Sequence, residues 1–99
     1  MTPDAIESFL YGACMLLSID DEGLNPERTC STDRNAVAGA CDMIIAADVA
    51  TPIDMALRNF AIKTSLVIVL PRGHELAALA VREWHQARNE FTALQLSVG

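Results

Sequence analysis

The chain has 99 residues, of which 52% are hydrophobic, and a formal net charge of −6 with Lys63 as its single lysine. Phosphate contacts need clustered Lys and Arg side chains, so this balance argues against direct nucleic-acid binding. The length suits one core, and we expect a single helical domain over residues 1–99. A typical soluble domain is about 45–50% apolar with glycine included. The excess here predicts that some apolar side chains meet a second copy or another protein.

The three cysteines, Cys14, Cys30 and Cys41, are odd in number and lack CxxC spacing, which indicates a reducing compartment. Cys14 and Cys41 fall among apolar residues and are expected to be buried, whereas Cys30 lies in a polar segment and is the most reactive candidate. The N-terminus lacks the basic and apolar regions of a signal peptide, and no apolar run could span a bilayer. We therefore expect a cytoplasmic protein without membrane contact.

Residues 2–18 predict the first helix. Thr2 offers a capping hydroxyl, Pro3 suits the first helical position, and Asp4 lies near the positive end of the helix dipole. Apolar residues recur at helical spacing along one face, which should be buried. These residues are Ile6, Phe9, Leu10, Ala13, Cys14 and Leu17.

Residues 20–31 are polar and contain Gly23 and Pro26, which predicts a long loop. Loops of this length are often functional. The spaced ligands and closing glutamate of a calcium-binding EF-hand are absent, so no metal is expected. The acidic residues of this loop are candidates for contact with a partner: Asp20, Asp21, Glu22 and Glu27.

Residues 33–47 predict a second helix, capped by Ser31 or Thr32. Asp42 is the only charged residue from position 36 to position 47. Because this helix is so apolar, we expect it to be the central helix of the bundle, packed between the other helices. Asp42 would then be a buried carboxylate in need of an arginine, backbone donors or a proton.

A third helix should begin at Thr51, with Asp54 returning a capping bond to Thr51. The apolar run from Leu66 to Leu70, ended by Pro71, covers every direction of a helix, and its β-branched residues favour extended structure. Two interpretations remain open. The helix continues to Leu70, or it breaks near Thr64 and the run forms an edge strand that pairs with a second copy.

The last predicted helix, from His74 to at least Phe91, is the clearest amphipathic pattern in the chain. Trp84 lies on its apolar side and His85 on its polar side. Core packing is the expected role of Trp84 and an interface anchor is the alternative, so Trp84 is kept as a partner-binding candidate. His85 is expected to be solvated.

No catalytic, cofactor or metal signature emerges from the sequence. His74 and Glu75 begin the zinc-protease pattern HExxH, but Ala78 stands where the second histidine is required. No glycine-rich loop follows a strand, which removes the usual phosphate sites. We expect a protein that is not an enzyme and has no cofactor; an enzyme that uses Cys30 is the least favoured reading.

The predicted fold class is all-α, a compact bundle of three to four helices in which Leu66 to Leu70 is a helix end or an intermolecular edge. The expected function is that of a non-enzymatic protein–protein interaction module. We expect it to form a homo-oligomer and to act by covering a surface on a larger partner. In size and acidic charge the chain is similar to phage-encoded inhibitors such as anti-CRISPR proteins. That resemblance implies inhibition of a nucleic-acid-handling protein. The alternative is a domain that binds a small molecule between helices, with Asp42, Arg58 or His85 as polar contacts.

Overall fold

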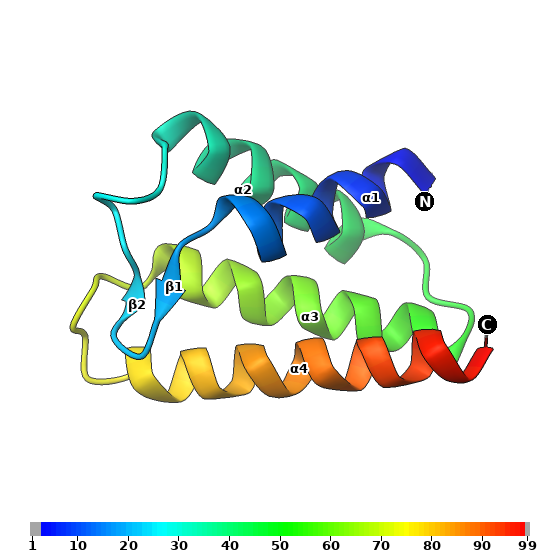
Figure 1. Cartoon of the computed structure of the whole chain (residues 1–99). Coiled ribbons are helices and arrows are strands. Elements are labelled where there is room, and N and C mark those ends of the chain that lie inside the picture. The colour runs from blue at the N-terminus through cyan, green and yellow to red at the C-terminus, as the bar shows by residue number, and fades with distance from the viewer. Residues whose placement is uncertain (1–2, 99) are drawn as a thin grey trace.

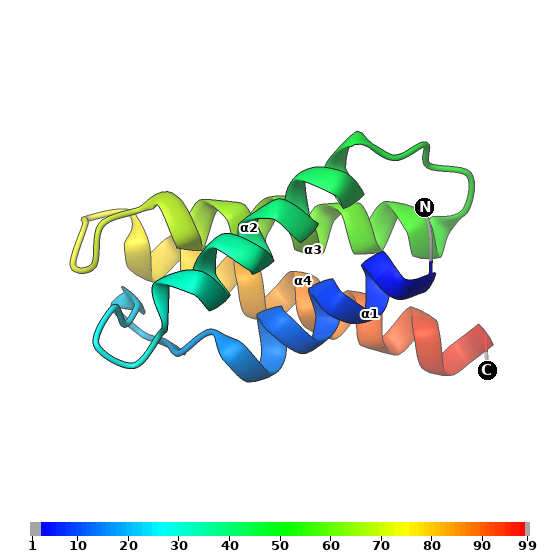
Figure 2. The ribbon, with the colours of Figure 1, turned by 90° about the horizontal axis from the view of Figure 1, so that it is seen from above.

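The computed structural model describes residues 3–98, which form four α-helices and a two-stranded hairpin (Figure 1). Consecutive helices run in opposite directions, and α2 crosses α3 diagonally in the view from above (Figure 2). The predicted helical bundle is therefore confirmed, with a small hairpin added. The elements are α1 (Pro3–Tyr11), the π-helical turn η1 (Gly12–Leu16), β1 (Ile19–Asp20), β2 (Gly23–Leu24), α2 (Ser31–Ala46), α3 (Pro52–Val69) and α4 (Ala77–Val98).

The core is centred on Phe60 of α3. Its ring centroid lies 5.1 Å from that of Phe9, 5.9 Å from that of Trp84 and 6.5 Å from that of Phe91. These rings come from α1 and α4, and α3 also packs against α2. The central helix is thus α3, and the prediction that the second helix is sandwiched was wrong.

Helix α2 packs through one face, at whose edge Ala40 and Ile45 are partly buried against the core. Its buried residues are Val37, Cys41 and Ile44, whereas Asp42 is exposed. The expected buried carboxylate does not exist. Most of the other apolar residues of this helix are alanines, and alanine loses little when it is exposed because its side chain is small.

The start of α2 also differs from the prediction. Ser31 is the first helical residue and Cys30 occupies the N-cap position, without a side-chain capping hydrogen bond. Ser31 and Thr32 therefore lie inside the helix, one and two positions too late to act as the cap.

The first helix ends earlier as an α-helix than predicted. After Tyr11 the chain forms a π-helical turn, closed by a 3.1 Å hydrogen bond from the Leu17 N–H to the Gly12 carbonyl. A π-helical turn contains one residue more than an α-helical turn. Residues after Tyr11 therefore no longer follow the 3.6-residue repeat from which their buried face was predicted. Cys14 is exposed, contrary to the prediction. The capping role expected of Thr2 lies outside the described residues.

Helix α3 begins as predicted and continues through the apolar run. The Thr51 hydroxyl accepts a 3.2 Å hydrogen bond from the Asp54 N–H, and the Asp54 carboxylate accepts one of 3.4 Å from the N–H of Ala50, not of Thr51. At the other end the Leu70 N–H donates to the Leu66 carbonyl at 3.1 Å. The run is a helix end, so the edge-strand alternative was wrong.

The predicted long loop contains the hairpin. Ile19 pairs with Leu24 and Asp20 with Gly23, whose φ of +117° suits glycine. The loop is tied at its base, because the Ser18 N–H donates to the Thr29 hydroxyl at 3.1 Å. Ordered backbone contacts thus hold the acidic residues of this segment in place.

The last helix begins three residues later than predicted, at Ala77, and runs to Val98. The Nδ1 atom of His74 accepts a hydrogen bond from the Leu76 N–H at 3.0 Å, so His74 belongs to the helix start, as its position in the sequence indicated. Leu76, the residue before this helix, is 52% exposed.

Candidate interaction surfaces

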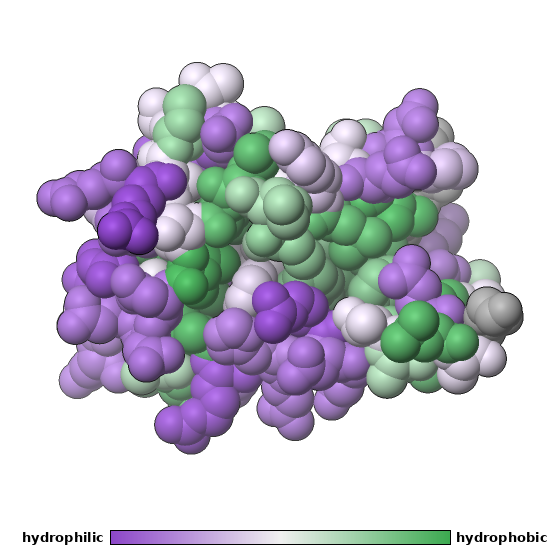
Figure 3. Space-filling model, in the orientation of Figure 1, coloured by the Kyte–Doolittle hydropathy of each residue, from purple (hydrophilic) through white to green (hydrophobic). Residues whose placement is uncertain are grey.

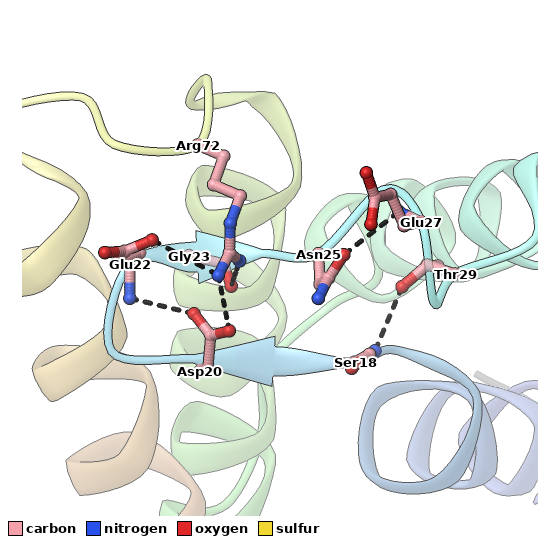
Figure 4. Close-up of polar contacts among 8 residues, drawn as sticks. All are labelled: Ser18, Asp20, Glu22, Gly23, Asn25, Glu27, Thr29 and Arg72. Carbon is pink, nitrogen blue, oxygen red and sulfur yellow. Dashed lines mark hydrogen bonds and ion pairs between the residues drawn. The ribbon is translucent and has the colours of Figure 1, made fainter.

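Arg72, in the connection between α3 and α4, binds the hairpin (Figure 4). Its Nη2 atom lies 2.6 Å from Asp20 Oδ2 and 3.3 Å from Glu22 Oε2. Its Nη1 atom donates to the Gly23 carbonyl at 3.4 Å, and the Gly73 N–H donates to the Glu22 carbonyl at 3.1 Å. Two loops that are distant in sequence are joined at one end of the bundle.

This arrangement divides the four acidic candidates into two pairs. The hydrogen bond from Arg72, helped by one from the Glu22 N–H, holds the pKa of Asp20 below its ordinary value. Asp20 and Glu22 therefore have a nearby cation that balances part of their charge. Asp21 and Glu27 are exposed and make no ion pair within residues 3–98. Figure 3 shows that this end of the molecule is mainly hydrophilic, whereas apolar surface is visible between α1 and the C-terminal half of α4.

Trp84 lies in the core and is only 4% exposed. Its indole N–H donates to the Thr64 hydroxyl at 2.9 Å. The guanidinium carbon of Arg88 lies 5.0 Å from the centre of the indole ring and covers it from outside. The structure thus places Trp84 where core packing was expected and offers little of it to a partner.

A shallow hollow of about 290 Å³ lies where the hairpin turn meets α4. Asp21 from the turn and Arg82 and His85 from α4 provide its polar groups, and Ala78 and Val81 provide its apolar floor. Because Arg82 and His85 are three residues apart on one helix, they face the same side. The hollow offers a carboxylate, a guanidinium and an imidazole to a small ligand.

The other polar contacts proposed for a small molecule lie elsewhere. Asp42 is exposed on α2, and Arg58 lines a separate hollow of about 360 Å³ beside Met55 and Ile62 of α3. The structure therefore does not bring Asp42, Arg58 and His85 together.

Helix α3 has a second apolar face, opposite the one that enters the core. Met55, Ile62, Leu66 and Val69 are 63%, 36%, 42% and 71% exposed. We call Met55, Arg58, Ile62, Leu66 and Val69 the outer stripe.

The cysteines differ in their environments. Burial raises the pKa of the Cys41 thiol to about 11. The backbone N–H groups of Asp33 and Thr32, near the thiol at the start of α2, favour its thiolate form and lower the pKa of the exposed Cys30. Desolvation raises the pKa of Cys14, although this residue is exposed, and the positive charge of Arg88 partly offsets the effect.

Within residues 3–98 no three His, Cys, Asp or Glu side chains are grouped as they would be around a metal ion. No helix in the described part of the chain is both long and apolar enough to cross a membrane.

Sequence reasoning identified the acidic loop but missed Arg72, because its contact with Asp20 joins residues 52 positions apart. One observation from the sequence pointed towards the outer stripe: the apolar run from Leu66 covers every direction of a helix. Comparison of the chain with protein-family models, with curated proteins and with solved structures gives no match.

Proposed function

We propose that this chain is a non-enzymatic protein-interaction module whose outer stripe is covered by another protein chain. The observation that carries the proposal is that α3 is apolar on two opposite faces. One face buries Leu57, Phe60 and Val67 in the core. The other, the outer stripe, stays partly in water, from 36% of Ile62 to 71% of Val69. Helices that are apolar all round are normally buried, so the outer stripe is suited to a second layer.

The energetic argument rests on how much these side chains gain from burial. Complete burial of a Leu, Ile, Val or Met side chain is favourable by roughly 1.5–3 kcal/mol. Met55 and Val69 keep more than half of their surface in water, at 63% and 71%. Contiguous exposed apolar surface of this kind is typical of sites that bind other proteins.

The acidic loop indicates which kind of partner this module would bind. We propose that the partner is a larger protein with a neutral or basic surface, such as a nucleic-acid-handling protein that the chain inhibits. The net charge of −6 supports this form, as does the position of Asp21 and Glu27, whose charges Arg72 does not pair. Charge complementarity of this kind acts mainly on the rate of association and on specificity.

The test is affinity capture of the tagged full chain from nuclease-treated lysate of its own or its host cell, followed by mass spectrometry. Val69→Glu places a charge on the outer stripe, and Leu96→Glu is the matched control, because Leu96 is also exposed, at 76%, but lies near the end of α4. We expect Val69→Glu to lose the captured protein and Leu96→Glu to retain it.

Two results would count against the proposal. One is capture that is equal for both variants, which would remove the outer stripe from the interaction. The other is a wild-type chain that is monomeric and retains no protein. Asp21→Lys combined with Glu27→Lys tests the acidic form separately, and unchanged capture by this double variant would remove that form alone.

The hollow between the hairpin and α4 favours a second candidate function, the binding of a small molecule. Asp21, Arg82 and His85 converge there from two elements. A ligand that binds only the folded state raises its thermal stability. A metabolite panel that raises the melting temperature of the wild-type chain, but not that of Arg82→Ala, would support this function; no shift with any compound would count against it.

A further inference from the structure

We propose that the chain covering the outer stripe is a second copy of this protein, with the two α3 helices packed antiparallel about a two-fold axis at Ile62. This inference rests on the proposed function, since it names the occupant of the same surface. It is argued from the spacing, charge and extent of the stripe.

The spacing is that of a helix pair. Met55, Ile62 and Val69 are seven residues apart, which is the repeat that keeps one seam of a helix facing a neighbouring helix. The pattern is also symmetric, because Met55 and Val69 are equally distant from Ile62. A two-fold axis at Ile62 places Met55 of one copy against Val69 of the second copy, and Ile62 against itself. Such self-complementarity is the requirement for a closed dimer.

The charges select the antiparallel direction. Arg58 is the one charged residue of the outer stripe, four positions before Ile62. In an antiparallel pair it faces Leu66 of the second copy, along which its aliphatic stem can pack. In a parallel pair the two Arg58 side chains would face one another and repel. Lys63, beside the axis, already binds Glu83 of its own chain at 3.0 Å and adds no unpaired charge.

Leu79, in the first turn of α4, and Leu76, the residue directly before α4, widen the surface. The Lys63–Glu83 contact fixes the antiparallel register of α3 and α4. One turn further along, this register brings Leu79 beside Leu66, and Leu76 lies one turn before Leu79. Leu76 and Leu79 are 52% and 47% exposed. The face thus joins the four apolar residues of the outer stripe to these two leucines.

The resulting area is sufficient for a specific dimer. A biological interface buries at least about 1,000 Å² in total. Six large side chains on each copy, each between 36% and 71% exposed, supply surface of that order when both copies are counted.

The first experiment measures the molar mass of the full chain in solution by light scattering over a concentration series. We expect twice 10.7 kDa for the wild type and for Leu96→Glu, and 10.7 kDa for Ile62→Glu and Val69→Glu. Val69 is the more exposed of the two sites, so Val69→Glu keeps the test valid if Ile62→Glu fails to fold, as judged by circular dichroism.

The second experiment determines the direction of packing by disulfide crosslinking under mild oxidation. Cys14 and Cys30, the two exposed thiols, are first replaced by Ser. Ile62→Cys lies on the proposed axis and should form a covalent dimer by itself. Val69→Cys should not, because its two copies would lie about 20 Å apart along the helices, far beyond the reach of a disulfide. Mixing Met55→Cys with Val69→Cys should give the mixed dimer.

A wild-type chain that stays monomeric at every concentration, or a Val69→Cys chain that crosslinks to itself, would overturn the inference. The proposed function fails differently. A monomeric chain that still captures a different protein, and loses it in Val69→Glu, overturns the second copy as occupant and leaves the interaction module standing.

Discussion

The indole nitrogen of Trp84 lies 2.9 Å from the hydroxyl oxygen of Thr64, and the Thr64 hydroxyl donates its own proton to the Phe60 carbonyl at 2.7 Å. Thr64 is fully buried and Trp84 is 4% exposed. The chain of hydrogen bonds therefore has little water to replace any member. It joins α3 to α4 at the level of the aromatic core.

Replacing Thr64 by Val, which is nearly isosteric, removes the acceptor and leaves the buried indole N–H unpaired. We expect the free energy of unfolding, measured by urea denaturation, to fall by about 1–3 kcal/mol. The control is the same change in a Trp84→Phe chain, where the donor is absent and the cost should be much smaller. Equal costs in the two backgrounds would show that the hydrogen bond is not the cause.

Replacing Gly12 by Ala should destabilise the contact between η1 and α2. A Cβ atom at Gly12 would lie 2.4 Å from Cγ2 of Val37, so one helix must shift, at a cost of typically 1–3 kcal/mol. Gly39→Ala is the matched control, because nothing lies within 4 Å of its added Cβ. It should stabilise α2 by about 0.5–1 kcal/mol. Thermal unfolding of both variants measures the contrast, and a neutral Gly12→Ala would contradict the close packing.

The Asp20–Arg72 contact should make stability depend on pH in the acidic range. The pKa of Asp20 is lowered in the folded state, so its carboxylate stabilises the fold above the unfolded pKa of about 3.9. This contribution is lost as the pH falls through the lower folded pKa. The melting temperature of Asp20→Asn should therefore lie furthest below that of the wild type near neutral pH. The difference should shrink below about pH 4. Asp42→Asn, an exposed site on α2, serves as the control, and a difference that stays constant down to pH 2 would exclude the contact.

The three thiols should react in a fixed order with an alkylating reagent. Cys30 should react first, because its pKa is lowered and it is exposed. Cys14 should follow. Cys41, with a pKa of about 11, holds only about one thiolate in a thousand at pH 8 and is buried. It should react only after unfolding, as mass spectrometry of labelled peptides can show. Early labelling of Cys41 in the folded chain would contradict its place in the core.

The sequence predicted the helices better than it predicted which of their faces is buried. The hydroxyl cap at Thr51 and the helical periodicity of residues 77–91 are local signals, and both were read correctly. The apolar run from Leu66 was ambiguous, because β-branched residues favour extended structure while tertiary packing can override that preference. In the structure the run is helical, and Val67 is buried against the rest of the core, with 1% of its surface exposed.

The candidate site was predicted less well. The acidic residues of the loop were visible in the sequence, but their pairing was not, because the ion pair between Arg72 and Asp20 closes only when α3 and the hairpin meet. Asp42 and Cys14 were assigned to the interior, yet both are exposed. Alanine-rich surroundings and a π-helical turn give no local sign of which direction a neighbouring side chain takes.

By itself the sequence determined the elements of this protein: four helical segments, the start of the third at its Thr51 cap, and an apolar content above that of a typical small domain. Only the tertiary structure decided that α3 is the central helix, that Trp84 points inward and that the outer stripe faces solvent. The physical reason is that helix formation depends on neighbours three and four residues away, whereas burial depends on which helices pack against one another. A helix that is apolar on two faces can bury either one, and the sequence does not state which.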